Sequence, residues 1–198
     1  MYLVLEGIDT AGKSTQIELL QDLYENLIIT KEPGATPLGE QIRDIVLHQE
    51  DLDSMTELLL FLSDRREHFA KRILPALKEH KTIISDRSFI SGIAYALTNK
   101  SLDQQKLTQL NLMVLDNTLP DGVVLFKLSK ETLTYRLSQK SHDGIEKRGI
   151  DYLLQVQDAL ITTTQDLGIK HIIVDASSKI ELIHEQIKDF MQLLGVQK

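Results

Sequence analysis

Eight residues near the N-terminus have the spacing of a phosphate-binding loop. Residues 7–14 read Gly-Ile-Asp-Thr-Ala-Gly-Lys-Ser and fit the P-loop pattern G-x-x-x-x-G-K-[ST]. The glycines allow backbone N–H groups to turn inward around phosphate oxygens, where a Cβ would obstruct the turn. Lys13 brings a positive charge to the terminal phosphates, and the Ser14 hydroxyl is a suitable ligand for Mg²⁺. The pattern predicts a site for nucleotide phosphates with magnesium.

The residues on either side of this loop support that interpretation. Residues 2–5 form an apolar run suited to a buried strand, and residues 14–20 have the periodicity of a helix. A helix that begins at the loop directs the positive end of its dipole at the anion. A glycine turn that fits the pattern by chance would not need this context, so we favour the phosphate site.

A second pair of charged residues follows another apolar run. Residues 82–87 read Thr-Ile-Ile-Ser-Asp-Arg, which places Asp86 where a carboxylate near magnesium is expected. Arg87 adds a planar cation that can bind a second phosphate through two hydrogen bonds. The alternative is a surface ion pair at a strand exit. A nucleotide kinase needs a second anion site, whereas motor and signalling NTPases do not, so Arg87 favours a kinase.

Two weaker features concern an acceptor site. Residues 31–39 hold two prolines and two glycines, which predict a rigid loop, and Arg43 follows in the next helix. Phe61 and Arg65 are spaced i and i+4 in a predicted helix from about 54 to 78, so they share one face. A ring beside a guanidinium suits a flat base. A core phenylalanine with a surface arginine is the commoner outcome, and the spacing alone does not decide between them.

The order of apolar runs predicts the elements that position these residues. Strand-like runs alternate with helical patterns, and they lie near residues 2–6, 27–30, 82–85, 122–128 and 170–174. Such alternation indicates an α/β fold in which a five-stranded parallel sheet has helices on both faces. Ligands of such sheets bind beyond the carboxyl ends of the strands. The chemistry is therefore expected after Glu6, Thr30, Ser85 and Asp175.

Composition narrows the class of protein. The chain has 198 residues, 42% of them hydrophobic, and we expect one domain over residues 1–198. Its net charge of −7 argues against a general nucleic-acid or membrane-surface binder. The absence of cysteine excludes disulfides and thiolate chemistry, and the six histidines lack metal-ligand spacing. No secretory signal or membrane-length apolar run is visible, so we expect a soluble, cytoplasmic protein.

One polar segment interrupts the alternation. Residues 138–149 contain two glycines and several cations between two amphipathic helices. A solvated loop is the alternative interpretation. In a chain with a P-loop we interpret the segment as a lid for phosphoryl transfer.

Taken in order, these residues resemble the thymidylate kinase family. The resemblance rests on the P-loop with an acid at Asp9 and on further motifs at 32–34, 36–39, 61/65, 86–88, 119–121 and 174–176. Family membership implies a P-loop NTPase fold of the nucleoside monophosphate kinase type. It also implies transfer of the ATP γ-phosphate to dTMP with Mg²⁺, usually in a homodimer.

The resemblance implies a role for each matching residue. ATP phosphates would lie in the loop made by Gly7, Ile8, Asp9, Thr10, Ala11, Gly12, Lys13, Ser14 and Thr15. Magnesium would bind at Ser14 and Asp86. The acceptor dTMP would contact Asp9, Arg43, Phe61, Arg65, Arg87, Ser91 and Tyr95, with Phe61 stacked on thymine and Arg65 at its carbonyl edge. The groups acting in transfer would be Lys13, Arg87 and Asp9, together with a cation from the lid.

Position 10 departs from part of the family, because some members carry arginine where this chain has Thr10. Members without that arginine usually supply one from the lid. Arg148 is our first choice here because it lies beside Gly149, where the chain can hinge. Lys140 and Arg136 are the reserves.

Two rival functions stay open. The nearest is another small nucleotide or deoxynucleoside kinase. The other is a P-loop switch without transfer activity, which is disfavoured because residues 99–102 lack the acid of a guanine-reading N-K-x-D motif.

Overall fold

A five-stranded parallel sheet forms the centre of the computed structural model, which describes residues 1–24, 26–49, 51–98, 103–139 and 148–196. The strand order is β2-β3-β1-β4-β5. The strands are β1 (Tyr2–Glu6), β2 (Leu27–Lys31), β3 (Thr82–Asp86), β4 (Gly122–Lys127) and β5 (His171–Asp175). The predicted α/β fold with a five-stranded parallel sheet is confirmed, and all five predicted strand positions are correct within two residues.

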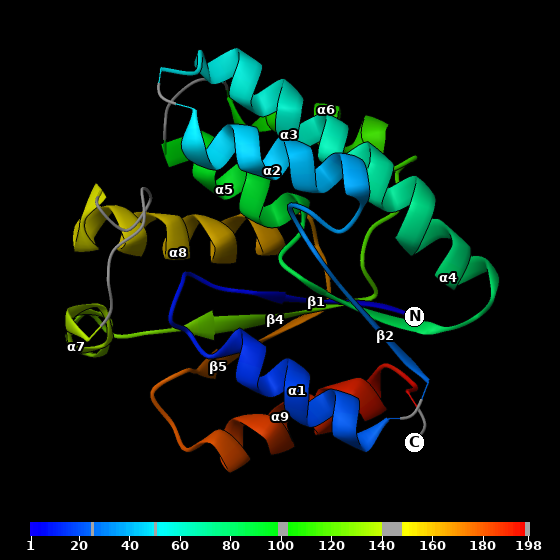
Figure 1. Cartoon of the computed structure of the whole chain (residues 1–198). Coiled ribbons are helices and arrows are strands. Elements are labelled where there is room, and N and C mark those ends of the chain that lie inside the picture. The colour runs from blue at the N-terminus through cyan, green and yellow to red at the C-terminus, as the bar shows by residue number, and fades with distance from the viewer. Residues whose placement is uncertain (25, 50, 99–102, 140–147, 197–198) are drawn as a thin grey trace.

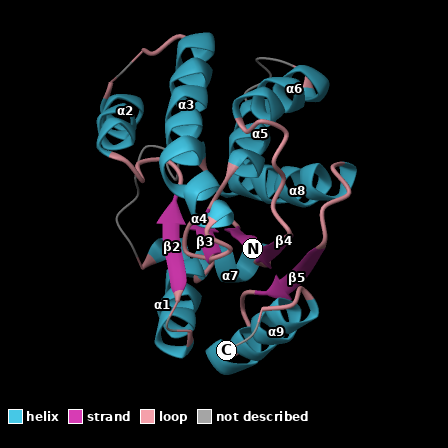
Figure 2. Cartoon of the chain, turned by 90° about the vertical axis from the view of Figure 1, so that its right-hand side faces the viewer, coloured by secondary structure: helices cyan, strands magenta, loops and turns pink. Residues whose placement is uncertain are grey.

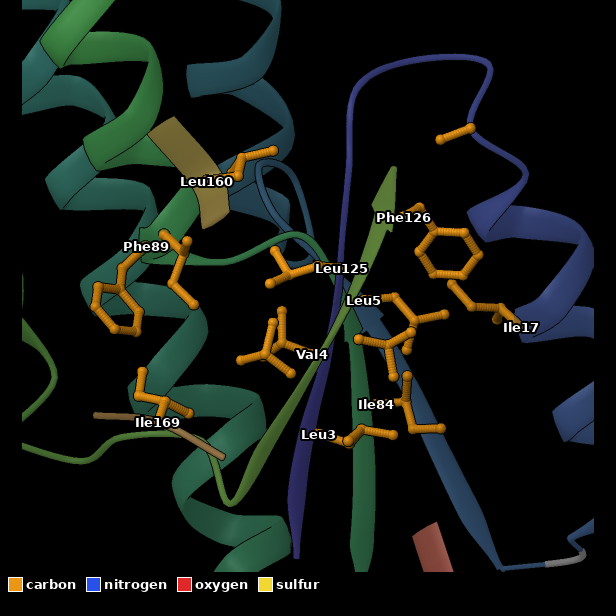
Figure 3. Close-up of a cluster of buried hydrophobic side chains, with 14 of the residues drawn as sticks. Leu3, Val4, Leu5, Ile17, Ile84, Phe89, Leu125, Phe126, Leu160 and Ile169 are labelled. Carbon is orange, nitrogen blue, oxygen red and sulfur yellow. The ribbon is translucent and has the colours of Figure 1, made fainter. Parts of the chain in front are cut away.

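The central strands are apolar on both faces because helices cover both sides of the sheet. Every residue of β1 is buried, as are the first five of β4. Their side chains pack with those of the covering helices, as Leu5, Ile17, Phe89 and Leu160 show in Figure 3. Continuous apolar runs of this kind are what a doubly covered parallel sheet requires.

Two layers of helices enclose the sheet (Figure 1). One face carries α1 (Lys13–Leu23) and α9 (Ile180–Leu193). The opposite side carries α2 (Pro37–His48), α3 (Ser54–His68), α5 (Phe89–Thr98), α6 (Gln104–Val114) and α8 (Ile150–Asp166). Figure 2 shows the same two layers from the side. The short α7 (Lys130–Ser138) follows β4.

The helix predicted from about 54 to 78 is continuous in the structure but not uniform. After α3, the π-helical segment η1 (Phe69–Ile73) leads into α4 (Leu74–Lys78). Pro75 stands in the first turn of α4. Because the helix continues from α3 through η1 into α4, Pro75 lacks the N–H for the hydrogen bond that a regular helix would form there. The widened turn therefore precedes the proline.

The sheet order creates a crevice where the ligand site is expected. β1 and β4 are neighbours, yet the chain leaves β1 toward one edge of the sheet and leaves β4 toward the other. Ligands of α/β sheets bind beyond the carboxyl ends of strands at such a reversal. The loop at residues 7–12 leaves the sheet at this point.

Only the two ends of the predicted lid are among the described residues. Of the predicted lid at 138–149, residues 140–147 lie outside the described residues.

Within the described ranges, none of the helices is both long enough and apolar enough to cross a membrane.

Candidate active site

The P-loop is placed by the end of β1 and the start of α1. Gly12 has φ +92°, a conformation that side chains disfavour, and it stands immediately before the helix. At Gly7 a Cβ would lie 2.9 Å from the Cβ of Phe126 in β4, so only glycine allows the loop to start this close to the sheet. The two glycines of the motif therefore meet a conformational and a packing requirement.

Lys13 is held inside the loop rather than in solvent. Its Nζ donates hydrogen bonds to the carbonyl oxygens of Gly7 at 2.9 Å and Ile8 at 3.3 Å, and it lies 3.9 Å from Oδ1 of Asp86. The residue is only 6% exposed. Burial lowers the pKa of Lys13 to about 8, and the positive charge of Arg87 acts in the same direction.

Arg87 lies directly beside this loop, although it comes from the end of β3. β1 and β3 pair in parallel, and the Arg87 N–H continues the ladder by donating to the Leu5 carbonyl at 3.0 Å. The side chain then bonds the Gly7 carbonyl through Nη1 at 2.8 Å and Asp9 Oδ1 through Nη2 at 2.7 Å. Lys13 and Arg87 therefore converge on the same carbonyl oxygen.

Two further residues named from the resemblance surround Arg87. Its Nη1 lies 3.4 Å from the hydroxyl of Ser91, and its guanidinium carbon lies 6.0 Å from the centre of the Tyr95 ring. Burial raises the pKa of the Tyr95 phenol to about 12, against the opposing effect of Arg87. Tyr95 is therefore a neutral hydrogen-bonding group at neutral pH.

Sequence reasoning missed Glu6 as part of this site. Its buried carboxylate accepts hydrogen bonds from Ser88 Oγ at 2.8 Å, Ser91 N at 3.2 Å and Ser91 Oγ at 2.5 Å. Burial raises the pKa of Glu6, although these bonds and Arg87 oppose the rise. Glu6 joins the end of β1 to the start of α5. The feature of the sequence that could have indicated Glu6 is its position as an acid at the end of the apolar strand β1.

The phosphate loop borders a cavity of about 420 Å³. Its lining residues are Asp9, Thr10, Ala11, Gly12, Lys13, Ser14, Thr15, Lys31, Glu32, Arg43, Asp86 and Arg87. A second cavity of about 510 Å³ runs beside it between α1 and β2, and Ser14, Lys31 and Asp86 line both. Most residues expected at the phosphates thus line one cavity.

The residues proposed for magnesium fit a hard cation. Oδ1 of Asp86 is inaccessible to solvent and has no hydrogen-bond partner among the described residues. Ser14 lies at the same cavity, so a hydroxyl and a carboxylate oxygen are both available there. Oxygen ligands of this kind are those that Mg²⁺ prefers.

Phe61 and Arg65, the pair predicted to bind the base, do not match the commoner outcome of a core phenylalanine with a surface arginine. Arg65 is not a surface arginine, because it is only 3% exposed. Its Nε donates to Glu32 Oε2 at 2.9 Å and its Nη1 donates to Asn111 Oδ1 at 2.6 Å. Phe61 on the same helix is partly buried. The surface-arginine alternative is therefore wrong.

Arg43 lies on α2 at the rim of the cavity around the P-loop. It is exposed, and its Nη1 donates to the Pro33 carbonyl at 3.3 Å. Pro33 belongs to the loop at residues 31–39, in which Thr36 caps α2 by accepting a hydrogen bond from Gly39 N.

The candidate cations near the predicted lid occupy different places. Arg148 bonds the Tyr152 hydroxyl at 2.9 Å and lies 5.3 Å from the centre of its ring. Arg136 instead reaches the P-loop, where its Nη1 donates to the Thr10 carbonyl at 2.7 Å. Its Nη2 donates to the Ala176 carbonyl at 2.7 Å. Lys140 lies outside the described residues.

The fold and this site together define a class of enzyme. A parallel sheet with a P-loop after its first strand, and a second cationic site at the end of the neighbouring strand, is the architecture of a P-loop nucleoside monophosphate kinase.

Comparison with known proteins identifies the family. The family model described as thymidylate kinase matches residues 5–187. The chain is 51% identical over 189 residues to a thymidylate kinase of Nautilia profundicola, covering 95% of each chain. It is 47% identical over 193 residues to one of Aliarcobacter butzleri, covering 98% of this chain and 100% of that protein. A crystal structure of thymidylate kinase from Ehrlichia chaffeensis superimposes with a TM-score of 0.76 at 29% identity, covering 97% and 98% of the two chains.

The chain belongs to the thymidylate kinase family, whose members are ATP-dependent phosphotransferases that convert dTMP to dTDP. The predicted family, fold and activity are confirmed. The individual site residues named from the resemblance stay predictions.

Proposed function

We propose that the cavity beside the P-loop aligns ATP and dTMP for direct transfer of the γ-phosphate. The observation that carries this proposal is the convergence of Lys13 and Arg87 on the Gly7 carbonyl, at 2.9 and 2.8 Å. One cation serves the donor phosphates and the other serves the acceptor phosphate. Two phosphates bound there are neighbours, and their alignment is the main task of phosphoryl transfer.

The surrounding residues complete the proposed mechanism. Ser14 and Asp86 would hold Mg²⁺, which neutralises charge on the ATP phosphates when bound. Asp9 orients Arg87 through the bond to Nη2. No general base is needed, because the attacking phosphate oxygen of dTMP is already an anion near neutral pH. Exclusion of water then prevents hydrolysis of ATP.

The acceptor nucleoside is proposed to lie between α3 and α5. Phe61 would stack on thymine and Arg65 would donate to its carbonyl edge. Ser91 and Tyr95 would border the sugar, and Arg43 would assist Arg87 at the phosphate. Support for this arrangement comes from the contacts of Arg87 with Ser91 and Tyr95, because they place α5 beside the phosphate site.

A panel of acceptors tests the proposal. ADP release is measured with ATP and each of dTMP, dUMP, dCMP, AMP, GMP and thymidine. We expect dTMP to give the highest kcat/KM. A preference for another monophosphate or for thymidine would support the rival kinase, and slow hydrolysis without stimulation by any acceptor would support a switch.

Truncation of Arg65 is expected to weaken dTMP binding selectively. The Arg65→Ala variant loses a charged donor to the base, which corresponds to about 1.5–3 kcal/mol. KM for dTMP should rise at least tenfold, whereas KM for ATP should stay near its original value. Steady-state kinetics measure both constants, and circular dichroism checks the fold. Equal losses for the two substrates would contradict the assignment of Arg65 to the base.

The pH dependence of ATP use should reflect Lys13. The phosphates need the protonated amine, so kcat/KM for ATP should fall as pH rises through about 8. This ratio reports ionisation of the free enzyme. Initial rates at limiting ATP and saturating dTMP measure the profile. A profile that stays flat to well above pH 8 would contradict a role for the charge of Lys13.

Arg148 is the proposed closing cation, because Thr10 leaves the P-loop without an arginine. A cation that acts mainly in the transition state affects kcat, so Arg148→Ala should lower kcat with little change in KM for dTMP. Adding Thr10→Arg should restore part of the rate. Steady-state kinetics on both single variants and the double variant test this. Unchanged kcat in Arg148→Ala would transfer the role to Arg136, which bonds the Thr10 carbonyl, or to Lys140.

We also propose that the chain is one kinase domain that forms a homodimer in the cytoplasm. Large apolar side chains are exposed on α2, α3 and α6, namely Leu38, Ile45, Leu47, Met55, Leu59 and Met113. These helices lie together on the side away from α1 and α9 (Figure 2). Sedimentation equilibrium of the purified chain tests the dimer.

A further inference from the structure

We propose that Asn111, on α6, is a positioning residue that orients Arg65 toward the acceptor base. This orientation sets a preference for bases that present a carbonyl oxygen to Arg65. This inference rests on the proposed role of Arg65 in base recognition. Asn111 does not line the cavity around the P-loop, and the family motifs quoted above do not include it.

The contacts of Arg65 leave one end of its guanidinium available. Nε is bonded to Glu32 and Nη1 to Asn111, at 2.9 and 2.6 Å. Nη2 has no hydrogen-bond partner among the described residues. It lies 2.7 Å from the point that a Cβ on Gly92 would occupy. The available donor therefore faces α5 beside Ser91, on the helix that borders Arg87.

The orientation of the Asn111 amide is determined by its second bond. Nδ2 donates to the Leu107 carbonyl at 2.7 Å, so Oδ1 is the atom directed at Arg65. A guanidinium only donates, and Oδ1 only accepts, so the two groups match in this orientation alone. Asn111 is completely buried, which means that water does not replace this bond when it is lost.

Glu32 fixes the other side of Arg65 and is itself fixed. Its Oε1 receives a bond from His68 Nδ1 at 2.9 Å, and His68 Nε2 lies 2.6 Å from the Thr30 hydroxyl. Burial raises the pKa of Glu32, but Arg65 and His68 outweigh it, so the net pKa is lowered and the carboxylate is charged. With the Glu32 carboxylate held in place, the hydrogen bond to Asn111 determines how the guanidinium plane is rotated about the Cδ–Nε bond of Arg65.

A guanidinium held in one orientation discriminates between bases. Nη2 can only donate, so thymine and uracil carbonyls are accepted at this position. The amino group of cytosine would place two donors against each other, which leaves buried polar groups unpaired. Without Asn111 the guanidinium is free to turn away from the amino group, and the penalty against cytosine decreases.

Three variants separate this role from a structural one. Asn111→Leu removes both bonds of the amide at similar size. Asn111→Asp keeps an oxygen acceptor for Nη1 but removes the donor to the Leu107 carbonyl. Gln157→Leu is the control, since among the described residues this buried amide on α8 bonds only the main chain of Leu128, at 2.8 and 3.0 Å.

The readouts are KM for dTMP, KM for ATP and the ratio of kcat/KM for dTMP over dCMP. Asn111→Leu should raise KM for dTMP about tenfold and lower the ratio about tenfold, as loss of a charged hydrogen bond predicts. KM for ATP should not change. Asn111→Asp should lie between Asn111→Leu and the original protein in KM for dTMP and in the ratio, because it still accepts from Nη1 but loses the bond to the Leu107 carbonyl. Gln157→Leu should affect neither KM nor the ratio. If Asn111→Leu does not fold, Asn111→Ala replaces it with the same expectations.

A double-mutant cycle with Arg65→Ala completes the test. In the Arg65→Ala background, Asn111→Leu should have no further effect on KM for dTMP, because it acts through Arg65. An equal effect in both backgrounds would overturn the inference, as would an Asn111→Asp variant as impaired as Asn111→Leu. If Arg65→Ala itself leaves KM and base preference unchanged, the base-binding role of Arg65 fails. If Arg65→Ala is impaired but Asn111→Leu is not, only the inference about Asn111 fails.

Discussion

Replacement of Lys13 by alanine is expected to lower kcat about a hundredfold or more while the protein remains folded. The charge is buried at the cavity, 3.9 Å from Asp86, where water cannot substitute for it. Interactions of this kind are strong because the site has a low dielectric constant and the donor is already in place. The measurement is initial-rate kinetics at saturating ATP and dTMP.

Lys127→Ala is the matched control for this variant. Lys127 is a lysine at the end of β4, but it is exposed and does not line the cavity. Its loss should leave kcat unchanged. Near-normal turnover of Lys13→Ala would contradict the assignment of the P-loop to ATP.

Stability gives an independent readout for Lys13. Its folded-state pKa of about 8 is below the ordinary value of 10.5, so the unfolded chain binds more protons between these values. The free energy of unfolding should therefore rise as pH increases through this interval. Lys13→Ala should lack this contribution. Denaturant titrations at several pH values compare the two proteins.

Replacement of Arg87 by alanine is expected to lower kcat/KM for dTMP about a hundredfold or more, with little change in KM for ATP. A guanidinium binds a phosphate through two charged hydrogen bonds, each worth about 1.5–3 kcal/mol. The fold should tolerate the change, because Asp9, its partner, is 32% exposed and can be hydrated. Arg87 has φ +68°, which costs alanine and arginine similar strain.

Arg87→Lys tests the geometry of the contact separately from the charge. Lysine keeps the positive charge but lacks the planar fork, so it should recover only part of the activity. Steady-state kinetics with each substrate varied in turn distinguish the effects on ATP and dTMP. Equal losses for both substrates, or an Arg87→Lys variant as active as the original, would contradict the proposed bidentate contact.

The sequence determined the fold class, the phosphate loop and the family. The P-loop is a contiguous motif, so its glycines and Lys13 could be assigned from spacing alone. The strands could be assigned because a sheet covered on both faces needs continuous apolar runs, such as residues 2–5. The P-loop and the strands depend on residues that are adjacent in the chain, and they can therefore be identified from the sequence.

The tertiary structure alone decided how the charged residues are paired. The i, i+4 spacing of Phe61 and Arg65 predicts a shared helix face but not whether that face is buried. Arg65 is buried because Glu32 and Asn111, which lie 33 and 46 residues away in the chain, accept its hydrogen bonds. Arg136, which is partly buried, likewise bonds a P-loop carbonyl 126 residues away. Such contacts form only when the sheet order brings distant segments together, and a buried charge is stable only with the partners that this arrangement supplies.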